Sequence, residues 1–326
     1  MRASPAQISI FVVAAIFLLV IFGRIAHEKN YVPDSLVNGF STALGRQTTQ
    51  SFMQTSERLW AKTVKERLEL RNVIYGQSDV GLFPAQTEQT LAAYPFTIWD
   101  MVPASYNCPF EVERIGRMGE GGKWVCGMSR YESAKNPIIM YSMGIQNDTS
   151  FEQQMMARTN AELWAYDLSI VDIAPFIHPA FRPRVHYQQI GIAGVTNPHN
   201  VPPYFSIIDL MAQNGHTYID ILKIDVEYAE FQALSTFELA TRQPNMEFPI
   251  GQIIIEIHLF HGDGTTVNGP LFLDWWASFE ARGMRPTWAE PNLLTVTMKS
   301  EDEMPRLAKY SWINVLDTRS KLWRNI

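Results

Sequence analysis

The sequence predicts an α/β fold with a doubly wound, mostly parallel sheet. Short apolar runs alternate with helix-like segments from Pro137 onward, and this alternation is typical of a parallel sheet covered by helices. Residues 219–230 show the pattern most clearly, because an apolar strand ends in Asp225 and Glu227 and then continues as a helix. Apolar residues make up 46% of the chain and charged residues 18%, so the chain can form a sizeable core.

Net charge and cysteine content narrow the function classes. The formal net charge of −6 argues against a protein that binds nucleic acid through phosphate contacts, because such surfaces are basic. The two cysteines, Cys108 and Cys126, lack the C-x-x-C spacing of a thiolate metal site. In an oxidising compartment they would pair, whereas elsewhere they would be two buried free thiols.

The N-terminal 29 residues predict a signal anchor. Residues 8–23 are apolar apart from Ser9, and basic residues flank them on both sides. This run is close to the lower limit of about 17 residues that can span a bilayer. A cleaved signal peptide is the alternative, although the exit from the apolar run lacks suitable small residues. We therefore expect a single-pass membrane protein of the secretory pathway, with the following domain on the lumenal side of the Golgi or endoplasmic reticulum, or secreted after cleavage.

Residues 30–95 predict a stem or linker, and residues 96–326 the main domain. The stem contains apolar residues at helical spacing over residues 51–74, which indicates an amphipathic helix. Residues 76–107 hold several prolines and look irregular. The glycine-rich segment that follows, residues 114–126, is not a P-loop, because Lys123 follows no G-x-x-x-x-G frame and precedes no serine or threonine.

The elements of the main domain follow in order. Residues 138–143 predict a first strand, and capping boxes that begin at Thr149 and Ser150 predict a helix from Phe151. A β-branched run over residues 250–259 predicts a strand buried on both faces. The remaining strands are expected at residues 162–166, 185–192, 219–224, 285–288, 293–298 and 312–316, and helices at residues 204–214 and 271–282 and after residue 228.

The turn after the first strand predicts a site for an adenosine-containing cofactor. Ser142-x-Gly144 opens the turn, and Asp167 ends the second strand, where an acid can accept hydrogen bonds from both ribose hydroxyls. This spacing fits S-adenosylmethionine or a dinucleotide. The turn lacks the G-x-G-x-x-G sequence that lets the backbone approach a pyrophosphate, so a dinucleotide is the weaker reading. The alternative is that Asp167 binds no cofactor and is a surface or helix-capping residue.

Two pairs of polar residues follow later strands. Glu256 and His258 are two apart and therefore face the same side of their strand, while Asp225 and Glu227 end the preceding one. If the two strands are neighbours, these side chains converge. They would then supply a general base, either His258 or a carboxylate with a raised pKa, for an acceptor hydroxyl. A hard-metal site and a purely structural polar network are the alternatives, and we expect no metal.

Five segments carry a family resemblance: GEGGKWVC (119–126), YSMGIQNDTSFE (141–152), YDLS (166–169), IDILKIDVEYAE (219–230) and QIIIEIH (252–258). In this order they resemble the FkbM-like S-adenosylmethionine-dependent methyltransferases, and more closely the related methyltransferase-domain family of secreted or membrane-anchored eukaryotic proteins. The resemblance implies a class I methyltransferase fold. It also implies cofactor contacts from Lys123, Ser142, Gly144 and Asp167, and positions near the reacting groups for Asp225, Glu227, Glu256 and His258.

The resemblance implies an enzyme that transfers a methyl group from S-adenosylmethionine to a hydroxyl of a sugar or a similar polar acceptor. One residue departs from the family pattern: Tyr228 stands where the family usually has glycine. This departure favours the rival hypothesis, a non-catalytic binding or scaffold protein of the secretory pathway that kept the fold. A nicotinamide-dependent oxidoreductase is a third possibility. The predicted partners are a small-molecule or glycan acceptor and the membrane, with no nucleic acid.

Overall fold

The computed structural model describes residues 49–75, 81–83, 87–243, 246–259, 267–297 and 304–323. The chain divides into two compact units, Met1–Phe52 and Met53–Ile326, and the fold given below is that of the second. The predicted signal anchor over residues 8–23 and most of the predicted linker lie outside the described residues. Within the ranges given above, no helix is both long enough and apolar enough to cross a bilayer.

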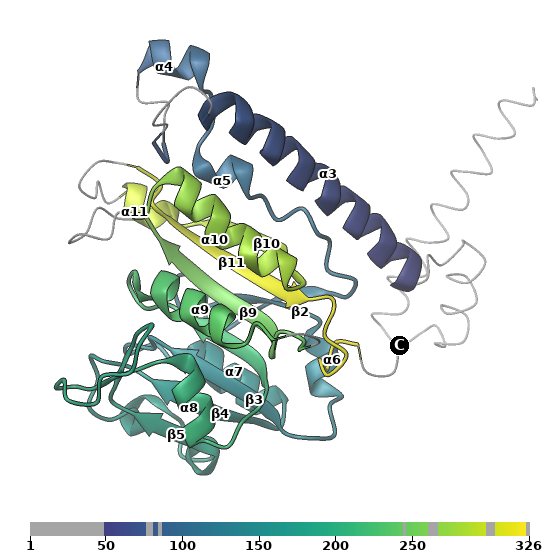
Figure 1. Ribbon diagram of the computed structural model, residues 1–326. Helices are drawn as coiled ribbons and strands as arrows, with labels where there is room; N and C mark the ends of the chain where they lie inside the picture. Colours follow the sequence, from purple (N-terminus) through teal and green to yellow (C-terminus); the bar gives the residue numbers. More distant parts are fainter. Residues whose placement is uncertain are drawn as a thin grey trace, which may run out of the picture. The chain divides into compact units, whose positions relative to one another are not determined.

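A seven-stranded sheet forms the centre of the second unit (Figure 1). Its order is β10-β11-β9-β8-β3-β4-β5. Neighbouring strands from β5 to β9 are parallel, whereas β11 runs antiparallel to both β9 and β10. The strands are β3 (Ile138–Met143), β4 (Ala161–Tyr166), β5 (Val185–Gln188), β8 (Ile219–Ile224), β9 (Ile250–His258), β10 (Met284–Pro291) and β11 (Leu307–Asn314). The predicted doubly wound, mostly parallel sheet is confirmed.

Burial on both faces explains why the central strands are nearly continuous apolar runs. Every residue of β8 and of β9 is buried. Alternate residues of β8 point to opposite faces, and Leu222 and Ile221 belong to different hydrophobic clusters. One cluster packs beneath α8 (Ile207–Gln213), α9 (Ala229–Ala240) and α10 (Gly269–Ala281). The other packs beneath α6 (Met128–Glu132) and α7 (Ser150–Arg158).

The helix predicted over residues 51–74 is confirmed as α3 (Thr49–Tyr75). It packs against α10 through a buried ion pair between Arg67 and Glu280, and the Trp60 indole N–H donates to the same carboxylate at 2.9 Å. The Arg285 guanidinium lies 3.4 Å from the centre of the Trp60 ring.

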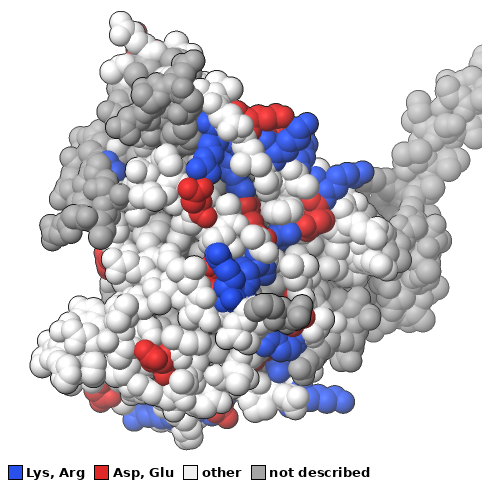
Figure 2. All heavy atoms as spheres, in the orientation of Figure 1, with Lys and Arg blue, Asp and Glu red and all other residues white. Residues whose placement is uncertain are grey.

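Figure 2 shows acidic and basic side chains next to one another on the face of the molecule in view, rather than gathered into a basic patch. The domain boundary at residue 96 stays a prediction.

Several predicted element boundaries are wrong. The strand expected over residues 185–192 splits into β5 and β6 (Gly191–Ile192), and β6 pairs with β7 (Tyr204–Phe205) in a separate small sheet. The helix expected from residue 204 begins at Ile207, because the Ser206 hydroxyl accepts a hydrogen bond from the Asp209 N–H. Two short helices, α4 (Glu88–Ala93) and α5 (Ile98–Met101), lie in the stretch expected to be irregular.

The end of the domain also differs from the prediction. Residues 293–298 were expected to be a strand, but Leu293–Thr297 form the helix α11. Periodicity cannot separate a short apolar run in a strand from one in a helix. The Asn292 carboxamide oxygen accepts from the Leu294 N–H and so turns the chain after β10. The last strand, β11, begins earlier than expected, at Leu307.

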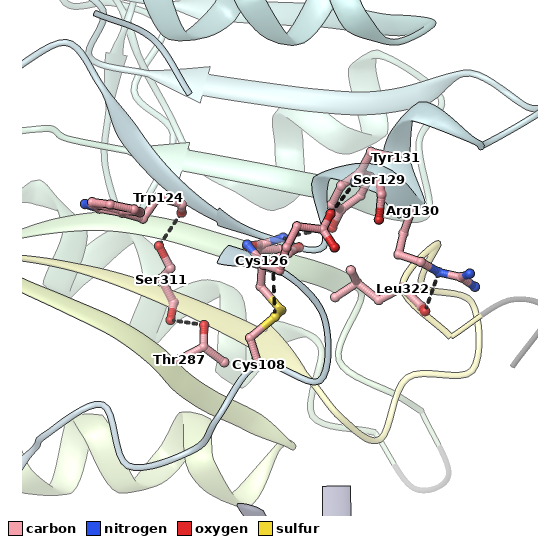
Figure 3. The surroundings of a disulfide bond; sticks show 11 residues. Cys108, Trp124, Cys126, Ser129, Arg130, Tyr131, Thr287, Ser311 and Leu322 are labelled. Carbon is pink, nitrogen blue, oxygen red and sulfur yellow. Dashed lines mark hydrogen bonds between the residues drawn. A yellow bond between two sulfur atoms is a disulfide. The ribbon is translucent and has the colours of Figure 1, made fainter. Parts of the chain in front are cut away.

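A disulfide fastens the glycine-rich segment to the sheet. Cys108 is bonded to Cys126, at the end of a hairpin formed by β1 (Val112–Ile115) and β2 (Lys123–Cys126). The Gln252 carboxamide of β9 bonds both the N–H and the C=O of Cys126, and the Ser311 hydroxyl of β11 donates to the Trp124 carbonyl (Figure 3). The hairpin is thus held over β9 and β11, and of the two alternatives left open by the sequence, paired cysteines or free thiols, the structure has the pair.

Candidate active site

A cavity of about 610 Å³ opens at the carboxyl ends of β3, β8 and β9. Its volume lies within the range of roughly 300–1,000 Å³ that small-molecule sites occupy, and its place is where open α/β sheets bind ligands. The turn of the β1–β2 hairpin forms another wall, and residues after β10 a third. The lining side chains and backbone come from Arg117, Glu120, Gly121, Lys123, Gly144, Ile145, Gln146, Asn147, Asp148, Lys223, Asp225, Glu227, Glu256, His258, Asn292, Leu294 and Leu307.

A second, smaller cavity of about 220 Å³ lies between α3 and α10. It is lined mainly by apolar side chains, and it shares no lining residue with the first cavity. None of the residues singled out from the sequence lies in it. We therefore place the candidate site in the larger cavity.

Two glycines let three segments meet around the cavity. Gly144 has a φ of +73°, and a Cβ added there would lie 1.7 Å from the backbone oxygen of Asp225. A Cβ added to Gly121 in the hairpin turn would lie 1.8 Å from a carboxylate oxygen of Asp148. At Gly144 only glycine allows both the left-handed backbone and the close approach to backbone, and at Gly121 the missing Cβ makes room for the Asp148 carboxylate. The loop after β3, the end of β8 and the hairpin turn therefore close on one another at the cavity.

Asp167 is not part of the cavity lining. One of its carboxylate oxygens accepts from the N–H groups of Ile145 and Gln146, both at 2.7 Å. The other accepts from the N–H and hydroxyl of Ser169 and from the N–H of Ile170. Burial opposes ionisation, but these hydrogen bonds outweigh it and hold the pKa of Asp167 below its usual value. In this structure Asp167 braces the loop after β3, and its role as a ribose ligand stays a prediction.

Ser142 likewise lies beneath the cavity and not in its wall. Its side chain is fully buried, and its hydroxyl donates to Glu152 of α7 at 2.5 Å. Of the four residues expected around the cofactor, only Lys123 and Gly144 line the cavity. The other two, Ser142 and Asp167, hold the loop that does.

The four residues expected near the reacting groups all line the cavity. The sequence analysis expected these side chains to converge if their two strands are neighbours. These strands are β8, which ends at residue 224, and β9, which ends at residue 258, and they are paired in parallel. The Lys123 ammonium lies between two of the acids, 3.4 Å from Asp225 and 3.8 Å from Glu256. Glu227 follows in a left-handed conformation with a φ of +51°.

Asp225 and Glu256 occupy opposite electrostatic environments. Burial raises the pKa of Glu256, and the negative charge of Asp225 raises it further. Burial also opposes ionisation of Asp225, but nearby positive charges outweigh it and hold the pKa of Asp225 below its usual value. Those charges belong to Lys123, Lys223 and His258. Two carboxylates with pKa values pushed apart are suited to different roles in one reaction.

His258 is held as an imidazolium at neutral pH. Its Nδ1 lies 3.1 Å from the carboxylate of Glu230, and its Nε2 lies 3.8 Å from that of Asp225. Burial lowers the pKa of His258, but Glu230 and the neighbouring acids reverse this and raise it to about 9. A protonated imidazole cannot accept another proton. Of the two bases considered from the sequence, the directions of the pKa shifts therefore favour the carboxylate with a raised pKa, Glu256.

We expect His258→Gln to change how stability depends on pH. The pKa of His258 is about 9 in the folded protein and 6.5 for an unperturbed histidine. The ion pair with Glu230 therefore stabilises the fold fully below about pH 6.5. That contribution, at most about 3 kcal/mol, is lost as the pH rises through 9. Urea unfolding of wild type and variant between pH 6 and 9.5 should show a stability difference that shrinks with pH. A difference independent of pH would contradict the imidazolium.

The side chains of this site that the sequence analysis did not predict include Glu230, Asn292 and Lys309. Glu230 is fully buried in the first turn of α9. Because apolar residues follow it, this acid could have been recognised in the sequence as a candidate site residue. Asn292 donates to Glu256 at 2.8 Å, and the Lys309 ammonium lies 3.8 Å from the same carboxylate while bonding Glu120. Asn292 and Lys309 reach the site through the antiparallel strands, whose pairing the sequence did not reveal.

Tyr228 adopts the left-handed conformation that its position requires, with a φ of +84°. Its side chain does not line the cavity. It packs instead on the apolar cluster beneath α9, with its ring 6.4 Å from that of Phe231. Tyrosine therefore strains the backbone by roughly 1–2 kcal/mol without filling the site.

Tyr228→Gly is expected to leave ligand binding unchanged. Relief of the left-handed strain and loss of the ring's packing act in opposite directions, so the free energy of unfolding should change by no more than about 1 kcal/mol. Calorimetric titration with S-adenosylmethionine should give a Kd within about twofold of wild type. A much tighter Kd would mean that Tyr228 obstructs the cavity.

The strand order and its single antiparallel insertion define a class I methyltransferase fold, with a Rossmann-like parallel core. The model of a family described as "Methyltransferase domain" matches residues 52–299, more than half of the chain. The chain therefore belongs to this methyltransferase-domain family. No three histidine, cysteine, aspartate or glutamate residues of the described ranges are grouped so that they could hold a metal ion.

Two curated relatives share part of this chain. "Probable methyltransferase-like protein 24" of Homo sapiens is 30% identical over 139 residues, which is 40% of this chain and 35% of that protein. The protein of the same name in Rattus norvegicus is 29% identical over 137 residues, with the same coverage. The match thus spans about a third of the length of these relatives.

Solved structures resemble the chain only weakly. The Methanococcus jannaschii fibrillarin pre-rRNA processing protein has a TM-score of 0.33 and 13% identity, over 55% of this chain and 67% of that one. Aeropyrum pernix fibrillarin in complex with S-adenosyl-L-methionine has a TM-score of 0.29 and 10% identity, over 54% and 66%. Strand order, and not these scores, defines the fold.

S-adenosylmethionine is the cofactor of this domain, and the cavity residues fit it. The missing Cβ atoms of Gly144 and Gly121 let the loop after β3, the end of β8 and the hairpin turn close together around the cavity. The lining offers carboxylates for a sulfonium and an amino group, and lysines for a carboxylate. It lacks the glycine-rich pyrophosphate turn that a dinucleotide needs.

Proposed function

We propose that the protein transfers the methyl group of S-adenosylmethionine to a hydroxyl oxygen of a sugar or a similar polar acceptor. The observation that carries this proposal is Glu256, a buried carboxylate whose pKa is raised by burial and by Asp225. A carboxylate of raised pKa is a better proton acceptor, and O-methylation releases a proton from the acceptor. The partial resemblance to FkbM-like methyltransferases supports the choice of acceptor.

The cavity residues would have different roles in methyl transfer. The loop after β3, from Gly144 to Asp148, holds the cofactor together with Lys123. Bound S-adenosylmethionine supplies a methyl group on a positively charged sulfur. Glu256 would take the proton that the acceptor hydroxyl releases when it is methylated. Asp225 would stay ionised and attract the positive charge of the cofactor, while Glu227 and charged His258 would complete the electrostatic surroundings.

Methyl transfer from isotopically labelled S-adenosylmethionine tests the proposal. The full chain, purified in a mild detergent, would be incubated with glycan fractions and with matched fractions whose hydroxyls are blocked by acetylation. We expect label in the first set only, in material that survives base treatment as an ether does. Label in neither set, although the protein binds S-adenosylmethionine, would contradict an O-methyltransferase.

The alternative is a non-catalytic protein of the secretory pathway that kept the methyltransferase fold for binding. The sequence suggests this alternative through Tyr228, where the resembling family usually has glycine, although the ring of Tyr228 lies outside the cavity lining. The two hypotheses differ in turnover: a binding protein would bind S-adenosylmethionine or a glycan and release no S-adenosylhomocysteine. A coupled assay for S-adenosylhomocysteine in the presence of glycan fractions separates them.

We also propose a lumenal or extracellular location, reached through a signal anchor at residues 8–23. The pairing of Cys108 with Cys126 supports it, because disulfides persist in oxidising compartments. In sealed microsomes, the domain should resist added protease until detergent is present. Digestion without detergent would contradict the proposed location.

A further inference from the structure

We propose that Trp124, Trp288 and Glu290 form an outer acceptor subsite that binds a neutral saccharide of about two rings. This inference rests on the proposed methyl transfer to a hydroxyl and names the class of acceptor. The three side chains lie outside the cavity lining, and they adjoin it on two elements. Trp124 follows Lys123 on β2, and Glu290 comes two residues before Asn292.

Two indole rings stack face to face, so each leaves at most one face for a ligand, and we call this pair the platform. The rings of Trp124 and Trp288 are 4.1 Å apart with an interplanar angle of 28°, and both residues are partly exposed. The Trp288 N–H is buried, so the exposed part of that ring is hydrocarbon. A sugar ring presents a face of C–H bonds, and a large, rigid aromatic surface is suited to pack against it.

Glu290 adds a polar edge to the platform. One of its carboxylate oxygens accepts from the Trp124 indole N–H at 2.6 Å, which fixes the carboxylate beside the rings. A carboxylate accepts several hydrogen bonds at once, so neighbouring hydroxyls of one sugar can bind to it. The apolar indole surface suits the C–H face of a sugar ring, and the fixed carboxylate at its edge suits the hydroxyls of that ring.

A row of side chains leads from this platform into the cavity. In the strand register, Glu290 of β10 is opposite Lys309 of β11, which is opposite Glu256 of β9. Cross-strand partners share one face of a sheet. Lys309 bonds Glu120 and lies 3.8 Å from Glu256, and both acids line the cavity. The platform and the proposed proton acceptor are therefore on the same face, two strands apart.

Strand spacing sets the length of the ligand. Neighbouring strands are about 4.8 Å apart, so β10 and β9 are separated by roughly 10 Å, about the length of a disaccharide. One ring would stack at Trp288 while a hydroxyl of the next ring reaches Glu256. The Glu290 carboxylate beside the platform would repel a carboxylated sugar, whereas Glu120 is paired with Lys309, and the charge of Glu290 therefore favours a neutral sugar.

The test uses the full chain and an array of neutral di- to tetrasaccharides, printed beside the same saccharides carrying a carboxylate. We expect binding to neutral members, and the best of them would be titrated by calorimetry. Trp288→Leu and Glu290→Gln should each weaken its Kd roughly tenfold, Trp288→Phe should weaken it less, and the Kd for S-adenosylmethionine should stay within twofold. The control Trp323→Phe changes a tryptophan that packs near Phe110 and should change neither Kd.

Each result separates this inference from the proposed methyl transfer. Binding of S-adenosylmethionine without any array member would overturn the saccharide subsite and leave the methyl donor in place. Glycan binding that Trp288→Leu and Glu290→Gln leave unchanged, or a preference for carboxylated members, would also overturn it. Glycan binding that depends on Trp288, in a protein that does not bind S-adenosylmethionine, would support the subsite and contradict the enzyme.

Discussion

Glu256→Gln is expected to lower kcat for methyl transfer by at least about 100-fold, the usual contribution of a positioned proton acceptor. Glutamine keeps the length of the side chain and can still accept from Asn292, which donates to Glu256 at 2.8 Å. It cannot take a proton from the acceptor. The Kd for S-adenosylmethionine, measured by calorimetry, should change by less than about threefold.

The same variant should not lower stability at neutral pH. The raised pKa of Glu256 means that folding disfavours its ionised form, so a neutral amide removes a cost. Glu162→Gln, a partly exposed acid of β4, serves as control and should keep wild-type kcat. In wild type, kcat should fall as the pH is lowered through the pKa of Glu256. An active Glu256→Gln enzyme would remove Glu256 from the mechanism.

Asp167→Asn is expected to cost about 3–5 kcal/mol of unfolding free energy, as removal of one partner from a buried charged network does. Both oxygens of Asp167 accept from backbone N–H groups. An asparagine would direct its own N–H₂ at some of these donors and leave them unsatisfied. Because Ile145 and Gln146 belong to the cavity wall, the Kd for S-adenosylmethionine should also weaken by at least about tenfold.

The changes in stability and in the Kd for S-adenosylmethionine together show whether Asp167 braces the loop or binds the ribose. A ribose ligand would lose affinity with little loss of stability, whereas a brace loses both. Urea unfolding and calorimetry on the same preparation would measure them together. Asp172→Asn is the matched control, because Asp172 is exposed and its carboxylate accepts a single N–H bond, from Ala174. Wild-type stability in Asp167→Asn would contradict the bracing role.

The parallel half of the sheet could be predicted because its strands carry local patterns. The apolar runs of β3, β8 and β9 are buried on both faces, and such runs stand out in a sequence. The antiparallel strands β10 and β11 could not be placed, because their pairing is set by long-range register. The helix α11 was read as a strand for lack of any local distinction.

The site was predictable where it depends on strand ends and not where it depends on loops. Asp225 and Glu256 come together because parallel neighbours end at the same edge. Asp167 ends a strand at that edge too, but the loop after β3 folds onto its carboxylate. That contact depends on the left-handed turn at Gln146, whose φ is +51°, and a residue pattern does not specify it.

Calorimetric titration of the full chain with S-adenosylmethionine tests the central claim most directly, with NAD as the comparison ligand. We predict saturable one-to-one binding of S-adenosylmethionine, weakened by Asp167→Asn and unchanged by Tyr228→Gly, and no binding of NAD. No measurable binding of S-adenosylmethionine by the folded wild-type protein would contradict the assignment of this cavity as a methyl-donor site.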